Sequence, residues 1–394
     1  MSYTEPLNMH SANYLAVCTH DDWRQMASVR TVGMNALRAI EAGAQLLSSG
    51  GGGDTHLPRM LVEDAIRRFG PVQLLSSDSL APRTPVCCTG LVGSVVSFGE
   101  KPAGAEVFEK AIQSLCRYKG SQVTAVFPYE CAGANAFLTL AHASVQRLPV
   151  LDLDFMGRAF HSLTQTTPTL HGLDLAPAVV TSTDGTVVLL DKVDNRGLEN
   201  FIRPMMRKLG GWGALAAFHE PHEIANRTAV SGSYSRAWGL GKLYIENLEN
   251  NGFDLRRTLA KLHEQSVLRS LGSGYVVDVH WTTRSQGGRR SPAAIFTVFM
   301  ESGNDGVIVS GEHLRLDAMH EFLLVSQNGQ VIAQAPEIIS VIDVRTQKAL
   351  QTSSLKQGMK VEIISLPPAP DWASAVGRSL SDPSYHGIKL PADK

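Results

Sequence analysis

The chain has 394 residues, of which 43% are hydrophobic and 19% are charged. This composition excludes a disordered chain, a collagen-like chain and a small disulfide-held scaffold, because it supplies enough apolar residues to bury substantial cores. Lysine plus arginine number 36 and aspartate plus glutamate number 37, giving a formal net charge of −1. Such a chain is a poor candidate for general nucleic-acid binding, which needs clustered cations facing phosphates. At roughly 150 residues per domain, the length predicts two domains and allows a third.

The cysteines predict neither a disulfide framework nor a cysteine zinc site, because their number is odd and they form no C-x-x-C pair. They are Cys18, Cys87, Cys88, Cys116 and Cys131. We therefore expect the reducing cytoplasm as the compartment. Residues 1–10 have no basic flank followed by an apolar run, so no signal peptide is expected. The longest uncharged stretch, residues 84–99, is too short and too rich in glycine and serine to span a bilayer.

The first part of the chain alternates between helix and strand patterns. Apolar residues at helical spacing predict helices at residues 37–47, 108–115 and 134–147. Residues 123–127 and 150–155 are typical of buried strands. Strand, helix and strand in this order indicate a βαβ unit in a largely parallel sheet. We therefore expect the fold class α/β for an N-terminal domain spanning residues 1–175.

Beyond residue 175 the pattern is that of an α+β domain. Asp184-Gly185 and Asn328-Gly329 favour type I′ hairpin turns, because both residues of each pair tolerate positive φ. Helices are predicted at residues 198–209, 233–248 and 255–262. Strands are predicted at residues 178–183, 186–190, 275–281, 295–300, 322–326, 331–334 and 361–366. We expect a C-terminal domain, residues 176–394, whose β-rich end forms an antiparallel sheet or a small barrel.

The glycine run 50–53 is the most unusual segment of the sequence. Glycine lets the backbone approach a ligand and adopt positive φ, so that adjacent N–H groups can form an anion-binding nest. A phosphate loop is disfavoured, because no Gly-Lys-Ser/Thr follows and the run comes after a helix. A flexible connector or helix C-cap is the alternative. Asp54 and His56, which follow, could bind a metal or a substrate, or could be solvated loop residues.

A second group of candidate residues lies between Glu130 and Asn135, where the strand 123–127 gives way to the next helix. The carboxyl end of a strand in an α/β sheet is a frequent ligand site, and the following helix N-terminus adds free N–H donors. Glu130 could act as an acid or base, and Asn135 could hydrogen-bond a planar amide or imide. Alternatively, both residues cap the helix. Cys131 is more typical of a small packing residue than of a nucleophile.

Asp152 and Asp154 form a third candidate, because residues two apart in a strand share one face. Two neighbouring carboxylates repel and raise one pKa, unless a metal or Arg158 relieves them. The alternative is that one carboxylate caps a turn and the other pairs with Arg158. His219 and His222 have helical spacing for a zinc site, but Pro221 lies between them, and we expect an exposed polar turn there.

Taken in order, these segments resemble the S-methyl thiohydantoin desulfurase-like family, long known as a domain of unknown function and also found fused to hydantoinase/oxoprolinase-type proteins. The resemblance covers residues 35–372 and rests on Ser49–Asp54, Glu130-x-x-Gly133-x-Asn135, Asp152-x-Asp154, Gly157-Arg158-Ala159-Phe160, Ala335–Asp343, Gly358–Val361 and the proline-rich stretch 366–372. His320-Glu321 stands where the family usually has Asn-Glu, and alanines flank Gly133 where a second glycine is usual.

The resemblance implies a hydrolase in which water attacks an sp² ring carbon of a hydantoin-like heterocycle and a thiol leaves. Because water is a weak nucleophile, a carboxylate or a metal must activate it. We expect Asp154 or Glu130 to do so, with Asp152 tuning the pKa of its neighbour. Substrate binding is expected to fall to Gly51, Gly52, Gly53, Asp54, Asn135 and Arg158. If a divalent metal such as zinc takes part, its candidate ligands are Asp54, His56, Asp152 and Asp154.

Two other functions stay open at this point. One is a non-catalytic or accessory subunit that partners a hydantoinase/oxoprolinase-type enzyme, and the other is amidase-like opening of a cyclic imide. In each case the expected ligand is a small heterocycle, with no nucleic acid and no membrane. We also expect a homo-oligomer, because domains of this size often assemble symmetrically.

Overall fold

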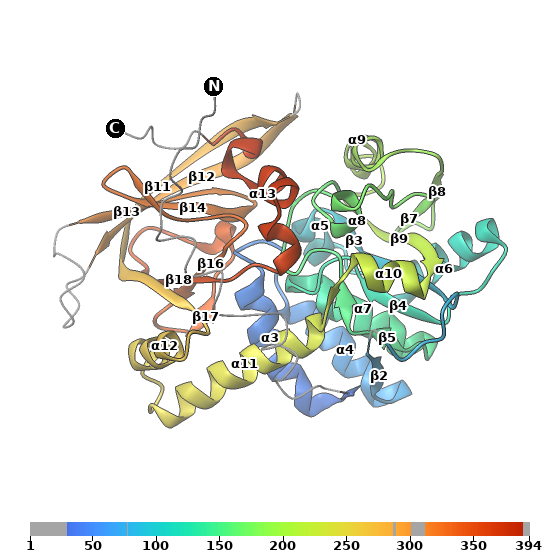
Figure 1. Cartoon of the computed structure of the whole chain (residues 1–394), viewed down its shortest axis with the longest axis horizontal. Helices are drawn as coiled ribbons and strands as arrows, with labels where there is room; N and C mark the ends of the chain where they lie inside the picture. The colour runs from blue at the N-terminus through green and yellow to red at the C-terminus, as the bar shows by residue number, and fades with distance from the viewer. Residues whose placement is uncertain (1–29, 77, 287–288, 301–311, 389–394) are drawn as a thin grey trace, which may run out of the picture.

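The computed structural model describes residues 30–388 except 77, 287–288 and 301–311. Cys18 and the first ten residues therefore lie outside the described part. Two lobes lie side by side, each built around its own sheet (Figure 1). Within the described residues, no helix has both the length and the apolar character that crossing a bilayer would need.

The sheet of the first lobe is mixed. In spatial order its strands are β1 (Thr31–Val32), β2 (Val72–Leu75), β5 (Val150–Leu151), β4 (Ala125–Pro128), β3 (Pro85–Gly93), β9 (Trp212–Pro221), β7 (Ala178–Ser182) and β8 (Val187–Leu190). Strands β2, β5, β4 and β3 pair in parallel, and the pairs on either side are antiparallel.

Apolar layers cover both faces of this sheet. Along β3, Cys87 and Leu91 enter one core while Val86 and Cys88 enter the other. A strand buried on both faces shows no alternation of apolar and polar residues, and this accounts for the long uncharged stretch around it. The helices of this lobe are α3 (Met34–Leu47), α4 (His56–Phe69), α5 (Val95–Glu100), α6 (Ala105–Lys119), α7 (Gly133–Gln146), α8 (Thr167–Leu170), α9 (Asn195–Met206) and α10 (His222–Thr228).

The sheet of the second lobe pairs its strands antiparallel throughout the described residues. In spatial order they are β15 (Gln330–Gln334), β14 (Glu321–Gln327), β13 (His313–Met319), β12 (Arg289–Met300), β11 (Arg269–Gln286), β18 (Lys360–Leu366), β16 (Ile338–Asp343) and β17 (Lys348–Ala349). Its further elements are α11 (Ser233–Asn250), α12 (Leu255–Glu264), α13 (Ala375–Ser381) and the 3₁₀ turns η1 (Thr352–Ser354), η2 (Pro370–Ala373) and η3 (Pro383–His386). A short ladder joins β6 (Leu153–Asp154) to β10 (Val230–Ser231).

Helix α3 holds the two lobes together. It packs so closely on α11 that a Cβ on Gly43 would lie 1.8 Å from the Ala237 carbonyl oxygen, and one on Gly241 equally close to the Ala39 carbonyl oxygen. Glycine at both positions therefore allows the two helices to touch through their backbones. At its end, α3 is fixed to β16 by the Ser340 hydroxyl, which donates to the Leu46 carbonyl over 2.5 Å. The glycine run follows directly at this interface.

The predicted fold class is confirmed: an α/β N-terminal part is joined to a C-terminal part with an antiparallel sheet. Both predicted hairpins form. Asn328 (φ 51°) and Gly329 (φ 80°) both have the positive φ that a type I′ turn requires, whereas at Asp184-Gly185 only Gly185 (φ 85°) does, so the predicted turn type is wrong there. The domain boundary expected between residues 175 and 176 stays a prediction. Strands β7, β8 and β9 follow that boundary in the chain but belong to the first sheet, because β9 pairs with β3 along its length.

Two local predictions were wrong. The strand expected at 150–155 breaks at Asp152, where the chain leaves the first sheet and pairs with β10 instead. The segment around Pro221 is not an exposed turn: β9 ends at that proline and α10 begins directly after it. Both flanking histidines, His219 and His222, are buried. Pro221 is the N-cap residue of α10, so it lies before the helix and does not interrupt it.

Candidate functional site

Glu130 lies in the turn between β4 and α7 and is buried. The Asn135 side-chain amide donates to Glu130 Oε1 over 2.6 Å and to the Tyr129 hydroxyl over 2.9 Å. Asn135 Oδ1 in turn accepts from the Leu91 N–H over 2.7 Å. The Asn135 amide is thus engaged within the protein and fixes one oxygen of Glu130. Glu130 Oε2 makes no hydrogen bond among the described residues, so this oxygen is available to a ligand or a water molecule.

The pKa of Glu130 reflects this setting. Burial raises its pKa to about 8; the hydrogen bond from Asn135 opposes the rise, and the negative charges of Glu321 and Asp154 add to it. The backbone of Phe160 also faces the carboxyl and lowers its pKa slightly. A carboxyl that holds its proton near neutral pH can act as an acid as well as a base.

The glycine run wraps around this turn. Gly52 and Gly53 have φ of 67° and 81°, and the Gly52 carbonyl accepts from the Ala134 N–H over 2.8 Å. A Cβ on Gly133 would lie 2.3 Å from the Gly52 oxygen, so the glycine run and the Glu130 turn both need glycine where the two segments cross. The Gly51 N–H already donates to the Ser48 carbonyl over 2.8 Å. Of the three expected N–H donors, Gly51 is therefore satisfied internally.

Hydrogen bonds attach the residue before the glycine run, Ser49, to the second sheet. The Ser49 hydroxyl donates to the Phe322 and Ile339 carbonyls over 3.1 and 2.9 Å, and the Phe322 N–H donates to the Ser49 carbonyl over 2.7 Å. A Cβ on Gly51 would lie 2.6 Å from Cγ of Glu321. The loop thus lies between the Glu130 turn on one side and Glu321 of β14 on the other.

Asp152 and Asp154 support the backbone around α11. Asp152 Oδ1 accepts from the Tyr234 N–H over 2.7 Å, and its Oδ2 accepts from the Ser235 hydroxyl over 2.5 Å. This is an N-terminal helix cap. Burial raises the pKa of Asp152, and these hydrogen bonds oppose the rise.

Asp154 is still more fully engaged. Its Oδ2 accepts from the Cys131 N–H over 2.6 Å, and its Oδ1 accepts from the Gly157 N–H over 2.9 Å and the Ser233 hydroxyl over 3.0 Å. Burial raises its pKa to about 6 against the effect of these donors. With both oxygens engaged, Asp154 ties the Glu130 turn to α11. These contacts favour a positioning role for the two aspartates, and their expected catalytic role stays a prediction.

Arg158 is a buried cation on the loop after β6. Its Nη1 donates to the Glu337 carbonyl over 2.7 Å, and its guanidinium lies 4.7 Å from the centre of the Phe160 ring. Arg158 Nη2 has no hydrogen-bond partner among the described residues. Burial lowers the pKa of Arg158 to about 10, and the negative charge of Glu321 opposes that change. Arg158 therefore stays charged at neutral pH and keeps one donor for a ligand.

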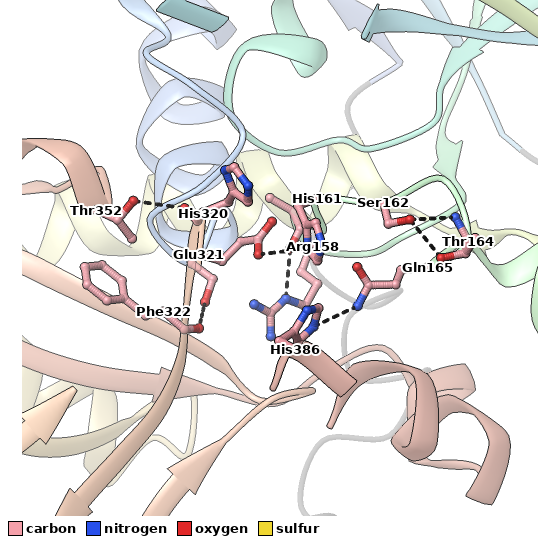
Figure 2. A network of polar contacts seen from close by, with 12 residues as sticks. Arg158, His161, Ser162, Thr164, Gln165, His320, Glu321, Phe322, Thr352 and His386 are labelled. Atoms are coloured by element: carbon pink, nitrogen blue, oxygen red, sulfur yellow. Dashed lines mark hydrogen bonds and ion pairs between the residues drawn. The ribbon is translucent and has the colours of Figure 1, made fainter. Parts of the chain in front are cut away.

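Figure 2 shows the Glu321 carboxylate pointing from the second sheet toward His161 and Arg158 of the first lobe. Glu321 Oε2 lies 3.7 Å from His161 Nδ1; the Glu321 side chain is 2% exposed and the His161 side chain 9%. The His161 ring stacks on His320 at a centroid distance of 5.4 Å and lies 4.7 Å from the His386 ring of η3. Burial is the main cause that lowers the pKa of His320 to about 4 and that of His386 to about 2, so both are neutral at pH 7.

The structure brings most of the predicted residues together but separates one pair from them. Those gathered at the lobe interface are Gly51, Gly52, Gly53, Glu130, Asn135, Asp152, Asp154 and Arg158. Asp54 and His56 are instead exposed at the start of α4, where the Asp54 carboxylate accepts from the His56 N–H over 2.7 Å. This is an Asx turn that opens the helix.

The expected metal ligands do not converge. Asp54 and His56 lie at the surface, whereas Asp152 and Asp154 are buried and use their oxygens on backbone and hydroxyl donors. Across the ranges that the structure describes, no cluster of three or more His, Cys, Asp or Glu side chains could hold a metal ion. The residues proposed as zinc ligands thus do not fit a shared ion.

Sequence reasoning missed four residues of the site. They are His161, His320, Glu321 and His386. One signal was available, because the His320-Glu321 pair aligned with a characteristic pair of the family. His320 adopts φ 67°, a conformation that histidine tolerates better than most residues do. The sequence separation of Glu130 and Glu321 left no local pattern to connect them.

The architecture defines a two-lobed α/β protein with a buried acidic site at the lobe interface. A family model described as "S-Me-THD-like, N-terminal domain" matches residues 35–192, and one described as "S-Me-THD-like, C-terminal domain" matches residues 193–394. The chain belongs to this S-Me-THD-like family, as the resemblance predicted.

Among solved structures, the chain is similar to an X-ray crystal structure of a protein from Chromobacterium violaceum, at 20% identity and a TM-score of 0.69. The match covers 92% of this chain and 98% of that one, and it shows a common fold. No curated protein matches the sequence.

Proposed function

We propose that this protein is a hydrolase that acts on a hydantoin-like heterocycle and releases a thiol from an S-methyl thiohydantoin-type ring. The observation that carries the proposal is the lobe interface, where Glu130 Oε2 and Arg158 Nη2 are buried with no hydrogen-bond partner in the part of the chain that the structure describes. Buried polar groups are normally paired, and both of these side chains interact with the charge of Glu321, so their open atoms favour a ligand site around that carboxylate. Membership of the S-Me-THD-like family supports the reaction class.

The proposed roles follow from which polar atoms are free. Glu130 exchanges a proton with the reactants, because its Oε2 is open while Asp154 has both oxygens engaged. Arg158 Nη2 donates to the imide part of the ring, as a preorganised donor where negative charge develops. The N–H groups of Gly52 and Gly53 add donors from the glycine run. Asn135 orients Glu130 instead of contacting the ring.

The test is incubation of the purified protein with S-methyl thiohydantoins and, separately, with hydantoins. Free thiol is assayed by a chromogenic disulfide, and ring-opened product by mass spectrometry. Thiol release that Glu130→Gln lowers at least about a hundredfold supports the proposal. The control is Glu362→Gln, which removes another buried carboxylate, in β18 of the second sheet, outside this site.

Two other results would reject the proposal, and a third would change only its mechanism. Ring opening without thiol means a cyclic-imide amidase. No turnover alone, but turnover together with a hydantoinase-type enzyme, means an accessory subunit. If a chelator abolishes thiol release, a metal takes part in the reaction even though the expected ligands lie apart.

A further inference from the structure

We propose that Glu321 is the base that activates water at this site and that Glu130 is its partner acid. The proton transfers would then be divided between two carboxyls, one from each lobe. This inference rests on the proposed hydrolase function and adds a catalytic residue to it.

The position of Glu321 is tightly constrained. It begins β14, is 2% exposed, and its Cγ lies against the backbone of Gly51, where a Cβ would be only 2.6 Å away. His320, just before it, is held at φ 67°, so the chain turns sharply between β13 and β14. Strained backbone of this kind persists where surrounding contacts determine it, and it is concentrated at functional sites. The carboxylate thus has a fixed direction into the interface.

The two carboxyls have opposite electrostatic surroundings. Glu321 Oε2 faces His161 Nδ1 at 3.7 Å, and the buried Arg158 cation interacts with the same carboxylate. Glu130 instead has Glu321 and Asp154, both acidic, as its charged neighbours. Cations stabilise an ionised carboxylate, and anions favour a protonated one. Burial and two acidic neighbours favour the protonated form of Glu130, and the Arg158 cation lies beside the Glu321 carboxylate, so the arrangement assigns the acid role to Glu130 and the base role to Glu321.

The proton transfers balance. As the water oxygen bonds to the ring carbon, the Glu321 carboxylate takes one water proton, and Glu130 gives its proton to the ring nitrogen whose C=N π bond breaks. The C–S bond then breaks, its electron pair leaves on sulfur, and Glu321 returns its proton to the thiolate. The ionised Glu130 takes the hydroxyl proton as the carbonyl forms. One water is consumed, one thiol is released, and both carboxyls return to their starting states.

The experiment compares thiol release by wild type, Glu321→Gln and the control Glu362→Gln. We expect Glu321→Gln to lower kcat at least about a hundredfold with KM changed less than about threefold, and the control to stay within about twofold. Formate is added to Glu321→Ala as a small replacement carboxylate, with an expected gain of at least about tenfold. Circular dichroism checks that each variant folds.

Should Glu321→Gln fail to fold, Glu321→Asp keeps the charge but retracts it by one methylene. Its expected loss in kcat is at least about tenfold, and unchanged kcat would overturn the inference. A loss below tenfold in folded Glu321→Gln, or no gain with formate, would also overturn it while the hydrolase function stands. If wild type releases no thiol, the proposed function itself fails and this inference with it.

Discussion

Removing the Glu130 carboxyl should make the protein more stable, by an amount that grows with pH. The pKa of this group is raised from 4.5 to about 8 by burial, with added repulsion from Glu321 and Asp154. Between pH 4.5 and about 8, the folded state therefore keeps a proton on Glu130 that the unfolded chain has released. The stability that Glu130 contributes is fully present below pH 4.5 and is lost as pH rises toward 8.

The magnitude follows from the pKa difference. Each pH unit between 4.5 and 8 costs the folded state about 1.4 kcal/mol. Wild type should therefore lose about 3 kcal/mol relative to Glu130→Gln by pH 7, and about 5 kcal/mol above pH 8. Glutamine is uncharged and its carbonyl can still accept the Asn135 hydrogen bond, so the comparison isolates the charge.

The assay is urea denaturation of both proteins at each pH unit from 4 to 9. The difference in free energy of unfolding should rise with pH and level off above the pKa of Glu130. The exposed Glu264→Gln, on α12, is the matched control and should give a flat difference. A Glu130→Gln difference that varies by less than about 0.5 kcal/mol over the whole range would refute the buried, protonated state on which the acid role depends.

Three further predictions concern the same interface. Gly133→Ala should lower the free energy of unfolding in urea by at least about 2 kcal/mol, because the new Cβ would be strained at positive φ and would also lie 2.3 Å from the Gly52 carbonyl oxygen. The control Gly232→Ala, at φ 78° with open space around it, should lose only the strain of about 1 kcal/mol, and equal losses in the two variants would contradict the clash. Wild-type kcat/KM should fall about tenfold per pH unit above about 8, as Glu130 loses its proton. Asn135→Ala should move this fall to higher pH, because the hydrogen bond from Asn135 lowers the pKa of Glu130. An activity that rises through pH 8 would instead identify Glu130 as the base. His320→Val should lower the free energy of unfolding, measured by thermal denaturation, by about 2 kcal/mol, because a β-branched residue rarely adopts φ 67°. His320→Asn should lose less than about 1 kcal/mol, and similar losses in the two variants would show that the turn relaxes.

Local patterns were enough to determine much of the fold. The helical spacing of apolar residues identified α3, α6 and α11, and the Asp184-Gly185 and Asn328-Gly329 turns defined two hairpins, because these preferences act within a few residues. They did not reveal β3 and β9, whose residues are buried on both faces or packed in mid-sheet and so lack alternation. They also could not show that the strand 150–155 divides at Asp152, which depends on pairing with β10.

The site was only partly determined by the sequence. Glu130 and the glycine run could be identified because a strand end, a helix start and unusual glycines are local signals. Tertiary structure decided which of their polar atoms are engaged: hydrogen bonds engage Asp154 and Asn135, while Glu130 Oε2 has no partner among the described residues. Only folding brings Glu321 next to them, because α3 joins the lobes and passes the glycine run against β14. Whether a carboxyl is charged depends on its burial and neighbours, and these exist only in the folded chain.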